Sequence, residues 1–157
     1  MSDNKAPTIG SVSFSTTNVD TSKASTRTID VSFNNLTDDI SGISSAQIGY
    51  KSPSGNNSVS GYASVNASEV LSKSSLIGEI QFNEYAESGE WTFDYMYVYD
   101  KAGNYKYYYK NDLDNVPSDL TVGDGSSNTN TFIRNNSFYT IVDGPSWTES
   151  EANAVAL

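Results

Sequence analysis

Residues 93–110 read FDYMYVYDKAGNYKYYYK, with seven tyrosines and one phenylalanine around a short polar break. In that break, Asp100 takes the first position of a turn and Gly103 the fourth, as in a type I turn that a left-handed glycine closes. Aromatic residues on both sides of the break favour strands. The stretch therefore predicts a β-hairpin, and its polar turn is the first place to look for chemistry.

The strand that leads into this turn changes its alternation along its length. Trp91 and Phe93 share one parity, whereas Met96 and Val98 share the other. A continuous strand cannot bury all four side chains on one face, because successive side chains point to opposite faces. A β-bulge at residues 94–95 would insert one extra residue and bring both halves to the same face.

The rest of the chain also favours strands over helices. Of its 157 residues, 36% are apolar and 18% are charged, and Ser, Thr, Asn, Gly and Tyr are abundant. Such a composition is typical of strands and turns. Ile29, Val31 and Phe33 share one face of a strand by period-two alternation. Similar patterns indicate further strands at residues 8–15, 45–52, 58–65 and 76–82. We therefore expect an all-β fold.

The net charge limits the partners of this chain. Nine basic and nineteen acidic residues give a formal charge of −10. A chain with this charge repels the phosphates of nucleic acid and attracts divalent cations where its carboxylates converge. No apolar run approaches the length of a membrane span. We expect neither a nucleic-acid partner nor membrane insertion.

The chain contains no histidine and no cysteine. This excludes disulfides, thiolate metal sites and Ser–His catalytic pairs. Paired carboxylates could still support glycoside hydrolysis. However, the glutamates within residues 79–90 have no partner that the sequence can name, and a solvated face explains them better. The pattern favours a protein that is not an enzyme.

Five short motifs carry a resemblance to a known class of domain: APTI, LTDDISGISS, SPSG, SGEWTF and VYDKAGNY. Together they resemble the immunoglobulin-like β-sandwich modules that are strung along bacterial secreted and surface proteins. The resemblance covers residues 6–122 and implies an antiparallel immunoglobulin-like sandwich that serves as an extracellular spacer, stalk or adhesion segment. It also implies that the partners are adjacent domains of the same protein, and that Ca²⁺ stiffens some such modules.

A second resemblance covers residues 138–157, where YTIVDGPSWTESEANAVAL is similar to the opening strand and first helix of C-type lectin-like domains. A Trp-x-Glu-x-Glu run begins the helix in that family, and acidic residues followed by alanines suit a helix start. Gly, Ser and Asn dominate the stretch before it, as in a linker. The expected organisation is a flexible N-terminus (1–5), a sandwich (6–122), a linker (123–130) and a partial lectin-like segment of strand plus helix (131–157).

Two acidic loops form the first candidate site. Asp38 and Asp39 lie between two strands, and Asp100 and Asn104 lie in the hairpin turn. In an immunoglobulin-like sandwich these loops emerge at the same end. Three carboxylates, an amide carbonyl and backbone oxygens would give the ligand set that Ca²⁺ favours. The alternative is that the aspartates only cap their own turns through hydrogen bonds to the backbone.

The hairpin tyrosines form the second candidate site. With a bulge at residues 94–95, tyrosines of the first hairpin strand point outward. Their rings could form a platform for a carbohydrate ligand. The alternative is that the rings pack against one another across the strands and shield the core. The candidate residues are Tyr97, Tyr99, Tyr105, Tyr107 and Tyr109.

Overall fold

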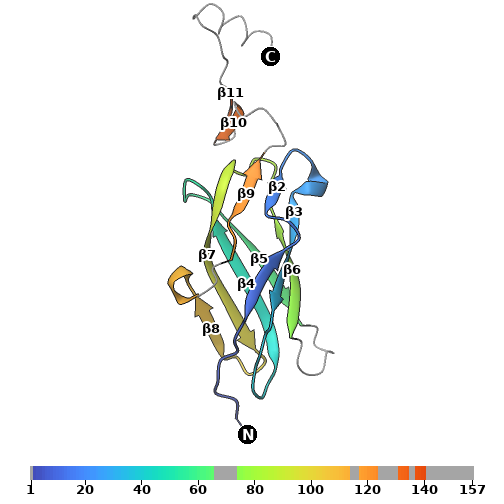
Figure 1. Ribbon diagram of the computed structural model, residues 1–157, viewed down its shortest axis with the longest axis vertical. Helices are drawn as coiled ribbons and strands as arrows, with labels where there is room; N and C mark the ends of the chain where they lie inside the picture. Colours follow the sequence, from blue (N-terminus) through green and yellow to red (C-terminus); the bar gives the residue numbers. More distant parts are fainter. Residues whose placement is uncertain (1, 66–73, 114–116, 124–130, 135–136, 141–157) are drawn as a thin grey trace, which may run out of the picture.

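The computed structural model describes residues 2–65, 74–113, 117–123, 131–134 and 137–140, and this part of the chain is all-β (Figure 1). Its strands are β1 (Ser11–Phe14), β2 (Asn18–Asp20), β3 (Thr28–Asn34), β4 (Ile43–Lys51), β5 (Ser58–Ser64), β6 (Ser75–Gln81), β7 (Gly89–Asp100), β8 (Tyr105–Tyr108), β9 (Leu120–Gly123), β10 (Thr131–Arg134) and β11 (Ser137–Thr140).

The helical content of the described residues is limited to two short 3₁₀ turns, η1 (Ala24–Thr26) and η2 (Lys110–Asp112). Neither comes near the length and hydropathy that a membrane-crossing helix needs. The helix that we expect at the C-terminal end falls on residues 141–157, which lie outside the described residues.

Nine strands form one mixed sheet in the order β1-β3-β6-β5-β4-β7-β9-β2, and β8 also pairs with β7. All neighbours are antiparallel except β2 and β9, which run parallel. The sequence predicted antiparallel pairing, so the parallel pair differs from the prediction. The sequence did not indicate β2 because three residues carry too little alternation to be recognised as a strand. The hairpin of β10 and β11 forms a second, two-stranded sheet.

The large sheet curls strongly, so that strands far apart in its order face each other across one core (Figure 1). The ring centroids of Phe14 in β1 and Tyr50 in β4 lie 6.0 Å apart, although three strands separate β1 from β4 in the sheet. Tyr50 in turn meets Phe93 of β7 at 6.2 Å. Phe82, just after β6, meets Trp91 of β7 at 5.2 Å. The first and third of these edge-to-face contacts join the two halves of the curled sheet, whereas Tyr50 and Phe93 are direct partners on neighbouring strands.

The core is built from alternate residues of the strands. Ile29, Val31 and Phe33 of β3 are all buried, which confirms the period-two prediction for this strand. On β6 the inward residues include Leu76 and Ile80. Each fully buried side chain of this size stabilises the fold by about 1.5–3 kcal/mol. The inward-facing set therefore provides the main stabilisation of the sheet.

The central strand β7 contains the predicted β-bulge. Gly49 of β4 pairs with Tyr95, but the next residue, Tyr50, pairs with Phe93, so Asp94 has no partner across the strand pair. The extra residue turns both halves of β7 toward the core. The buried side chains are Trp91, Phe93, Met96 and Val98.

The hairpin that joins β7 to β8 also agrees with its sequence. Gly103 adopts a φ of 94°, the left-handed conformation that the turn requires. The backbone nitrogen of Asp100 donates to the carbonyl oxygen of Asn104 at 3.0 Å and closes the turn. The side chain of Asp100 is 3% exposed, so the end of β7 directs a carboxylate inward.

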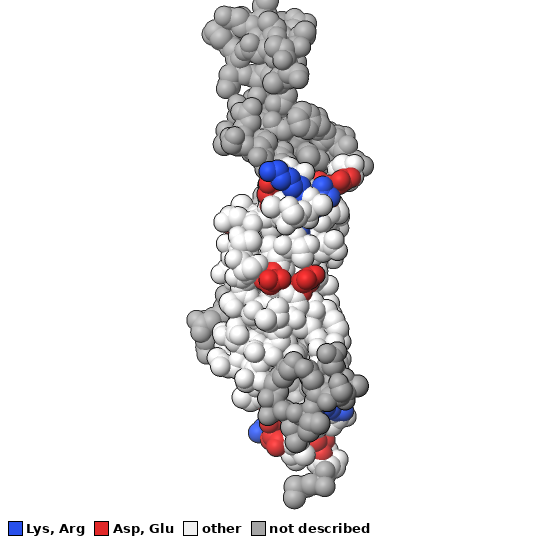
Figure 2. Space-filling view, turned by 90° about the vertical axis from the view of Figure 1, so that its right-hand side faces the viewer, with Lys and Arg blue, Asp and Glu red and all other residues white. Residues whose placement is uncertain are grey.

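Charged side chains are distributed unevenly over the surface. Figure 2 shows the right-hand side of the molecule in Figure 1, where acidic side chains stand near the middle and charges of both signs gather toward the ends. Asp30 of β3 and Glu79 of β6 are exposed and pair directly across the two strands. Like charges in this position destabilise a sheet slightly. The outer face of β3 and β6 therefore carries negative charge.

Candidate functional site

Two loops that are distant in the sequence meet at one pole of the sheet. The first, residues 35–42, joins β3 to β4, and the second, residues 101–104, joins β7 to β8. The backbone nitrogen of Lys101 donates to the carbonyl oxygen of Gly42 at 2.9 Å, and that of Ala102 donates to Oγ of Ser41 at 3.3 Å. The loops therefore emerge at the same end, as the sequence predicted.

Three carboxylates converge at this pole. One oxygen each of Asp3, Asp38 and Asp100 lies within 4.8 Å of the others. Asp100 is buried, and the other two residues are half-buried. We call these three residues the acidic cluster. Like charges at this separation repel one another, so their convergence needs a compensating interaction.

Asp38 uses one of its two oxygens to hold its own loop. Its Oδ2 accepts hydrogen bonds from the backbone nitrogens of Gly42 at 2.6 Å and Ile40 at 3.3 Å. This is the turn-capping role that formed the alternative interpretation of this residue. Its Oδ1 is buried and has no hydrogen-bond partner among the described residues. A buried carboxylate oxygen without a partner is costly, and native structures rarely keep one without a reason.

Asp100 is held by the turn that follows it. Its Oδ1 accepts from the backbone nitrogen of Asn104 at 2.8 Å, and its Oδ2 accepts from Nδ2 of the same residue at 2.7 Å. Nδ2 of Asn104 also lies 3.3 Å from the carbonyl oxygen of Asp3. The Asn104 amide therefore presents its nitrogen, a donor, to the cluster, and it holds Asp100 in place rather than offering the carbonyl oxygen that the sequence suggested.

Asp3 is a member of the cluster that the sequence did not suggest. Its Oδ2 accepts from the backbone nitrogen of Ser41 at 2.9 Å, and its Oδ1 accepts from that of Lys5 at 3.1 Å. The hydrogen bond with the Ser41 side chain, followed by that with Lys5, holds the pKa of Asp3 below its ordinary value. We expected residues 1–5 to form a flexible terminus, and no local pattern marks Asp3 as a ligand.

Asp39 is not one of the three carboxylates of the acidic cluster, although its side chain interacts with that of Asp3. Its side chain is 40% exposed, and its Oδ2 lies 3.8 Å from Nζ of Lys5. An exposed ion pair of this kind contributes little to stability. Of the predicted ligands, the structure therefore brings together Asp38, Asp100 and Asn104, and it adds Asp3.

The acidic cluster fits a calcium ion by ligand chemistry and by spacing. Ca²⁺ takes six to eight oxygen ligands at about 2.3–2.6 Å, so two oxygens on one ion lie at most about 5 Å apart. The 4.8 Å limit on the carboxylate oxygens satisfies this condition. A cation would also supply a partner for Oδ1 of Asp38, which has none among the described residues. The cluster can therefore bind a hard divalent cation.

The tyrosines of β7 and β8 form a second site on the outer face of the sheet. A Cβ added to Gly49 would lie 2.4, 2.7 and 2.9 Å from three consecutive ring atoms of Tyr95. Such similar distances mean that the ring lies flat over the glycine. The bulge at Asp94 turns Tyr95 outward, and Gly49 leaves the space that its ring occupies.

Tyr97 continues the flat surface that Tyr95 begins. The two rings are nearly parallel, at an interplanar angle of 7°, and their centroids are 6.1 Å apart. The side chain of Gln47 fixes both rings, because its Nε2 donates to the hydroxyl of Tyr95 at 2.9 Å and its Oε1 accepts from the hydroxyl of Tyr97. The ring of Tyr107 tilts against Tyr97 with centroids 5.2 Å apart.

The remaining hairpin tyrosines extend this surface. The ring centroids of Tyr99 and Tyr105 lie 5.0 Å apart, and those of Tyr107 and Tyr109 lie 5.6 Å apart. Tyr105 is 55% exposed and Tyr109 is 57% exposed. Burial raises the pKa of Tyr97 and Tyr107 above the ordinary value, and their tyrosine neighbours raise it further. We call the five predicted tyrosines together with Tyr95 the tyrosine surface.

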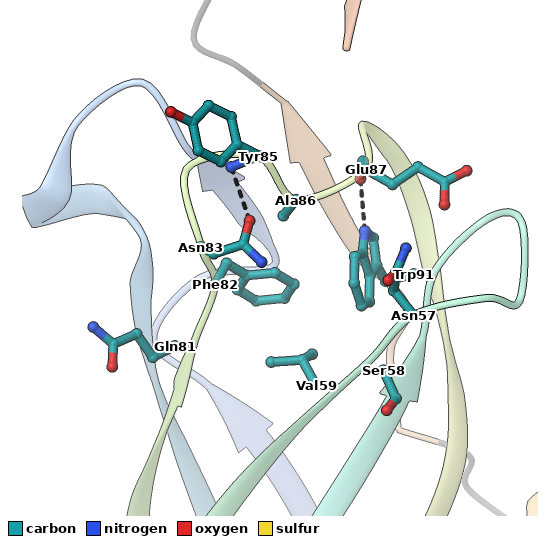
Figure 3. A pocket seen from close by; sticks show the side chains of 10 residues that line it. All are labelled: Asn57, Ser58, Val59, Gln81, Phe82, Asn83, Tyr85, Ala86, Glu87 and Trp91. Atoms are coloured by element: carbon teal, nitrogen blue, oxygen red, sulfur yellow. Dashed lines mark hydrogen bonds between the residues drawn. The ribbon is translucent and has the colours of Figure 1, made fainter. Parts of the chain in front are cut away.

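A small pocket of about 210 Å³ opens beside Trp91 near the start of β7 (Figure 3). Nε1 of Trp91 donates to the backbone oxygen of Glu87 at 2.8 Å. Asn57 and Asn83 lie on its rim, and Tyr85 stands above it (Figure 3). Glu87 is the one carboxylate among the lining residues, so this pocket does not bring together the two carboxylates that glycoside hydrolysis requires.

Comparisons of the chain with protein-family models, with curated proteins and with solved structures find no match. Within the part of the chain that the structure describes, the acidic cluster and the tyrosine surface are the two places where side chains converge in a chemically specific way.

Proposed function

We propose that this chain is a non-catalytic structural or adhesion module of a larger bacterial secreted or surface protein, and that Ca²⁺ stiffens it at one pole. Its fold would be an immunoglobulin-like β-sandwich. In that fold the strands form one sheet in the order ABED and a second in the order CFG. The strand orders β1-β3-β6-β5 and β4-β7-β9 correspond to these two sheets, with β8 and β9 sharing the role of strand G, although β5 also pairs with β4 and joins them into one curled sheet.

The single observation that carries the cation proposal is the buried Oδ1 of Asp38, which has no partner within the described residues and lies in a cluster of three carboxylates. Turn capping accounts for Oδ2 of Asp38 and for Oδ1 of Asp100. Backbone hydrogen bonds from Ser41 and Lys5 hold Asp3 in the same way, but they do not offset the repulsion among three carboxylates at one point, and they leave Oδ1 of Asp38 without a partner. A bound cation accounts for all three.

The mechanical role follows from the segments of the chain to which the three ligand residues belong. Asp3 lies in the segment before β1, whereas Asp38 and Asp100 belong to two loops of the folded sheet. A cation that binds all three would tie the N-terminal segment to the sheet. In a protein with several domains, this would restrict the angle between the module and the domain that precedes it.

The proposed location outside the cell rests on the resemblances of the sequence. Residues 6–122 resemble modules of bacterial surface and secreted proteins, and residues 138–157 resemble the start of a C-type lectin-like domain. A parent protein that places these two domains in succession would use the present module as a spacer. Extracellular modules bind Ca²⁺ with Kd of about 10⁻⁴–10⁻³ M, so a site of this kind would be occupied where Ca²⁺ reaches about that concentration.

Thermal unfolding with and without Ca²⁺ tests the proposal. A ligand that binds only the folded state stabilises it by about 2.7 kcal/mol at a hundredfold excess over Kd. For a chain of this length, that corresponds to a rise in Tm of roughly 5–10 °C. We expect this rise when EDTA is replaced by excess CaCl₂, and a smaller one with MgCl₂, because Mg²⁺ demands a stricter geometry. The same Tm in EDTA and in Ca²⁺ would reject the proposal.

A further inference from the structure

We propose that the tyrosine surface binds an extended, uncharged polysaccharide, and that Tyr95, Tyr97 and Gln47 form the centre of its binding site. This inference is independent of the acidic cluster, which lies at the pole of the sheet. The centre of this site differs from the site that the sequence indicated, because the sequence indicated neither Tyr95 nor Gln47.

The shape of the surface is the first argument. Tyr95 lies flat over Gly49, and Tyr97 lies nearly parallel to it at a centroid distance of 6.1 Å. These two nearly parallel rings, which we call the aromatic tile, present an aromatic surface of which Tyr95 forms the flat base. A pyranose ring with equatorial hydroxyls has a flat face of C–H groups that matches such a tile. Tyrosine also provides a large and rigid contact area with little loss of conformational entropy on binding.

The rigidity of the tile is the second argument. The amide of Gln47 links the hydroxyls of Tyr95 and Tyr97, and it holds both rings across the neighbouring strand. Tyr107 supports the second ring from the other side at 5.2 Å. The rings therefore already hold the positions in which a ligand would contact them. Such preorganisation increases affinity because little side-chain freedom is lost on binding.

The absence of charge on this face is the third argument. In the register of β5, β4, β7 and β8, the outward positions beside the tile are occupied by Ser, Gln, Gly and Tyr. These outward residues are Ser45, Gln47, Gly49, Ser60, Tyr62, Ser64, Tyr95, Tyr97, Tyr99, Tyr105 and Tyr107. Charged residues border this face at two places: Lys51 pairs with Asp94 at 3.7 Å at one end, and on the next strand Glu79 of β6 pairs with Tyr62. Beyond Glu79, Asp30 of β3 continues the negative charge along the outer side of the sheet.

The chemical class of the ligand follows from the shape, the rigidity and the charge of this surface. The outward positions of this face offer a cationic peptide no carboxylate to pair with, and the net charge of −10 repels polyanions. Hydroxyl and amide groups along its edges can donate to and accept from sugar hydroxyls. An extended neutral chain of β-linked pyranoses offers flat faces and hydroxyl edges in regular alternation. It is the ligand class that this surface fits.

Affinity electrophoresis in gels with soluble polysaccharide tests this inference. Hydroxyethyl cellulose and galactomannan serve as neutral probes, and carboxymethyl cellulose serves as the charged counterpart of the first. We expect the neutral polymers to retard the wild-type chain, in EDTA as well as in Ca²⁺, and carboxymethyl cellulose to retard it less. Tyr97→Ala should weaken the binding about tenfold, which is the scale of one lost aromatic contact.

Matched variants separate binding from folding. Tyr85 is 56% exposed but lies beside the Trp91 pocket, so Tyr85→Ala removes an exposed ring outside the tyrosine surface and should leave the affinity unchanged. Tyr107→Ala removes a more exposed ring of the surface and should weaken binding even if Tyr97→Ala lowers Tm. The proposal is overturned if neither neutral polymer retards the chain, if carboxymethyl cellulose retards it more strongly, or if Tyr85→Ala weakens binding as much as Tyr97→Ala.

Discussion

Asp38 and Asp100 come from different loops, yet their carboxylates place oxygen atoms within 4.8 Å of each other at one pole of the sheet. Each of the two residues also holds its own loop through hydrogen bonds to the backbone. Structural and ligand-binding roles are therefore combined in the same side chains. The loops are rigid before a cation arrives, and a cation adds a link between them.

Replacing Asp38 with Asn tests whether the acidic cluster binds the cation. Asp38→Asn removes one negative charge from the cluster and the loop hydrogen bonds of Asp38, which are worth about 0.5–1.5 kcal/mol each. In EDTA we expect the variant to lose no more stability than these hydrogen bonds account for. Its Tm should no longer rise with Ca²⁺. Asp39→Asn is the control from the same loop, because Asp39 interacts with Asp3 but is not one of the three clustered carboxylates, and it should keep most of the response. An equal loss of response in both variants would contradict the assignment.

Limited proteolysis tests the link between the N-terminal segment and the sheet. Trypsin can cleave after Lys5, which follows Asp3 closely, and cleavage requires the segment to leave the sheet. We expect Ca²⁺ to slow this cleavage severalfold. Cleavage after the exposed Lys23, in the loop between β2 and β3, should keep its rate. Asp3→Asn should abolish the protection at Lys5, and protection that survives this change would show that Asp3 is not a ligand.

Adding a methyl group at Gly49 tests the geometry of the tyrosine surface. In Gly49→Ala the new Cβ would lie 2.4 Å from the nearest ring atom of Tyr95, so the ring has to move. Overpacking of this kind costs about 1–3 kcal/mol. Gly123→Ala is the control, since a Cβ there meets nothing within 4 Å. Chemical denaturation should show a clear loss of stability in the first variant only, and equal stability of the two variants would mean that Tyr95 does not lie over Gly49.

Alkaline unfolding tests the burial of Tyr50. Burial raises the pKa of Tyr50 above its ordinary value, and its hydroxyl donates to the carbonyl oxygen of Ser118 at 2.9 Å. Above a pH of about 10 the unfolded chain releases this proton while the folded chain keeps it, so the free energy of unfolding falls by up to about 1.4 kcal/mol per pH unit. Below pH 10 the group has no such effect. Tyr50→Phe should lose stability less steeply above pH 10 than the wild type, and identical slopes would argue against a raised pKa.

The sequence predicted the local features of this fold well. The bulge in β7 was predictable because Trp91 and Phe93 differ in parity from Met96, and the turn was predictable because Gly103 follows Asp100 at the required spacing. Both signals lie within a few neighbouring residues. The meeting of the two acidic loops was predictable only through the resemblance to a sandwich fold.

The features that escaped prediction depend on contacts across the sheet. Asp3 has no pattern around it, and it joins the cluster because the segment before β1 passes the β3–β4 loop. Tyr95 becomes part of the outer surface because Gly49, on another strand, leaves space for its ring. The parallel strand β2 is fixed by its pairing with β9 rather than by its own three residues. Tertiary contacts, and not local propensity, determine all three.

Isothermal titration calorimetry with CaCl₂ measures the central claim most directly. The account predicts that one Ca²⁺ binds to each chain in metal-free buffer, and that the binding disappears in Asp38→Asn and in Asp100→Asn but persists in Asp39→Asn. The absence of binding at millimolar Ca²⁺, or binding that survives the loss of both Asp38 and Asp100, would contradict it.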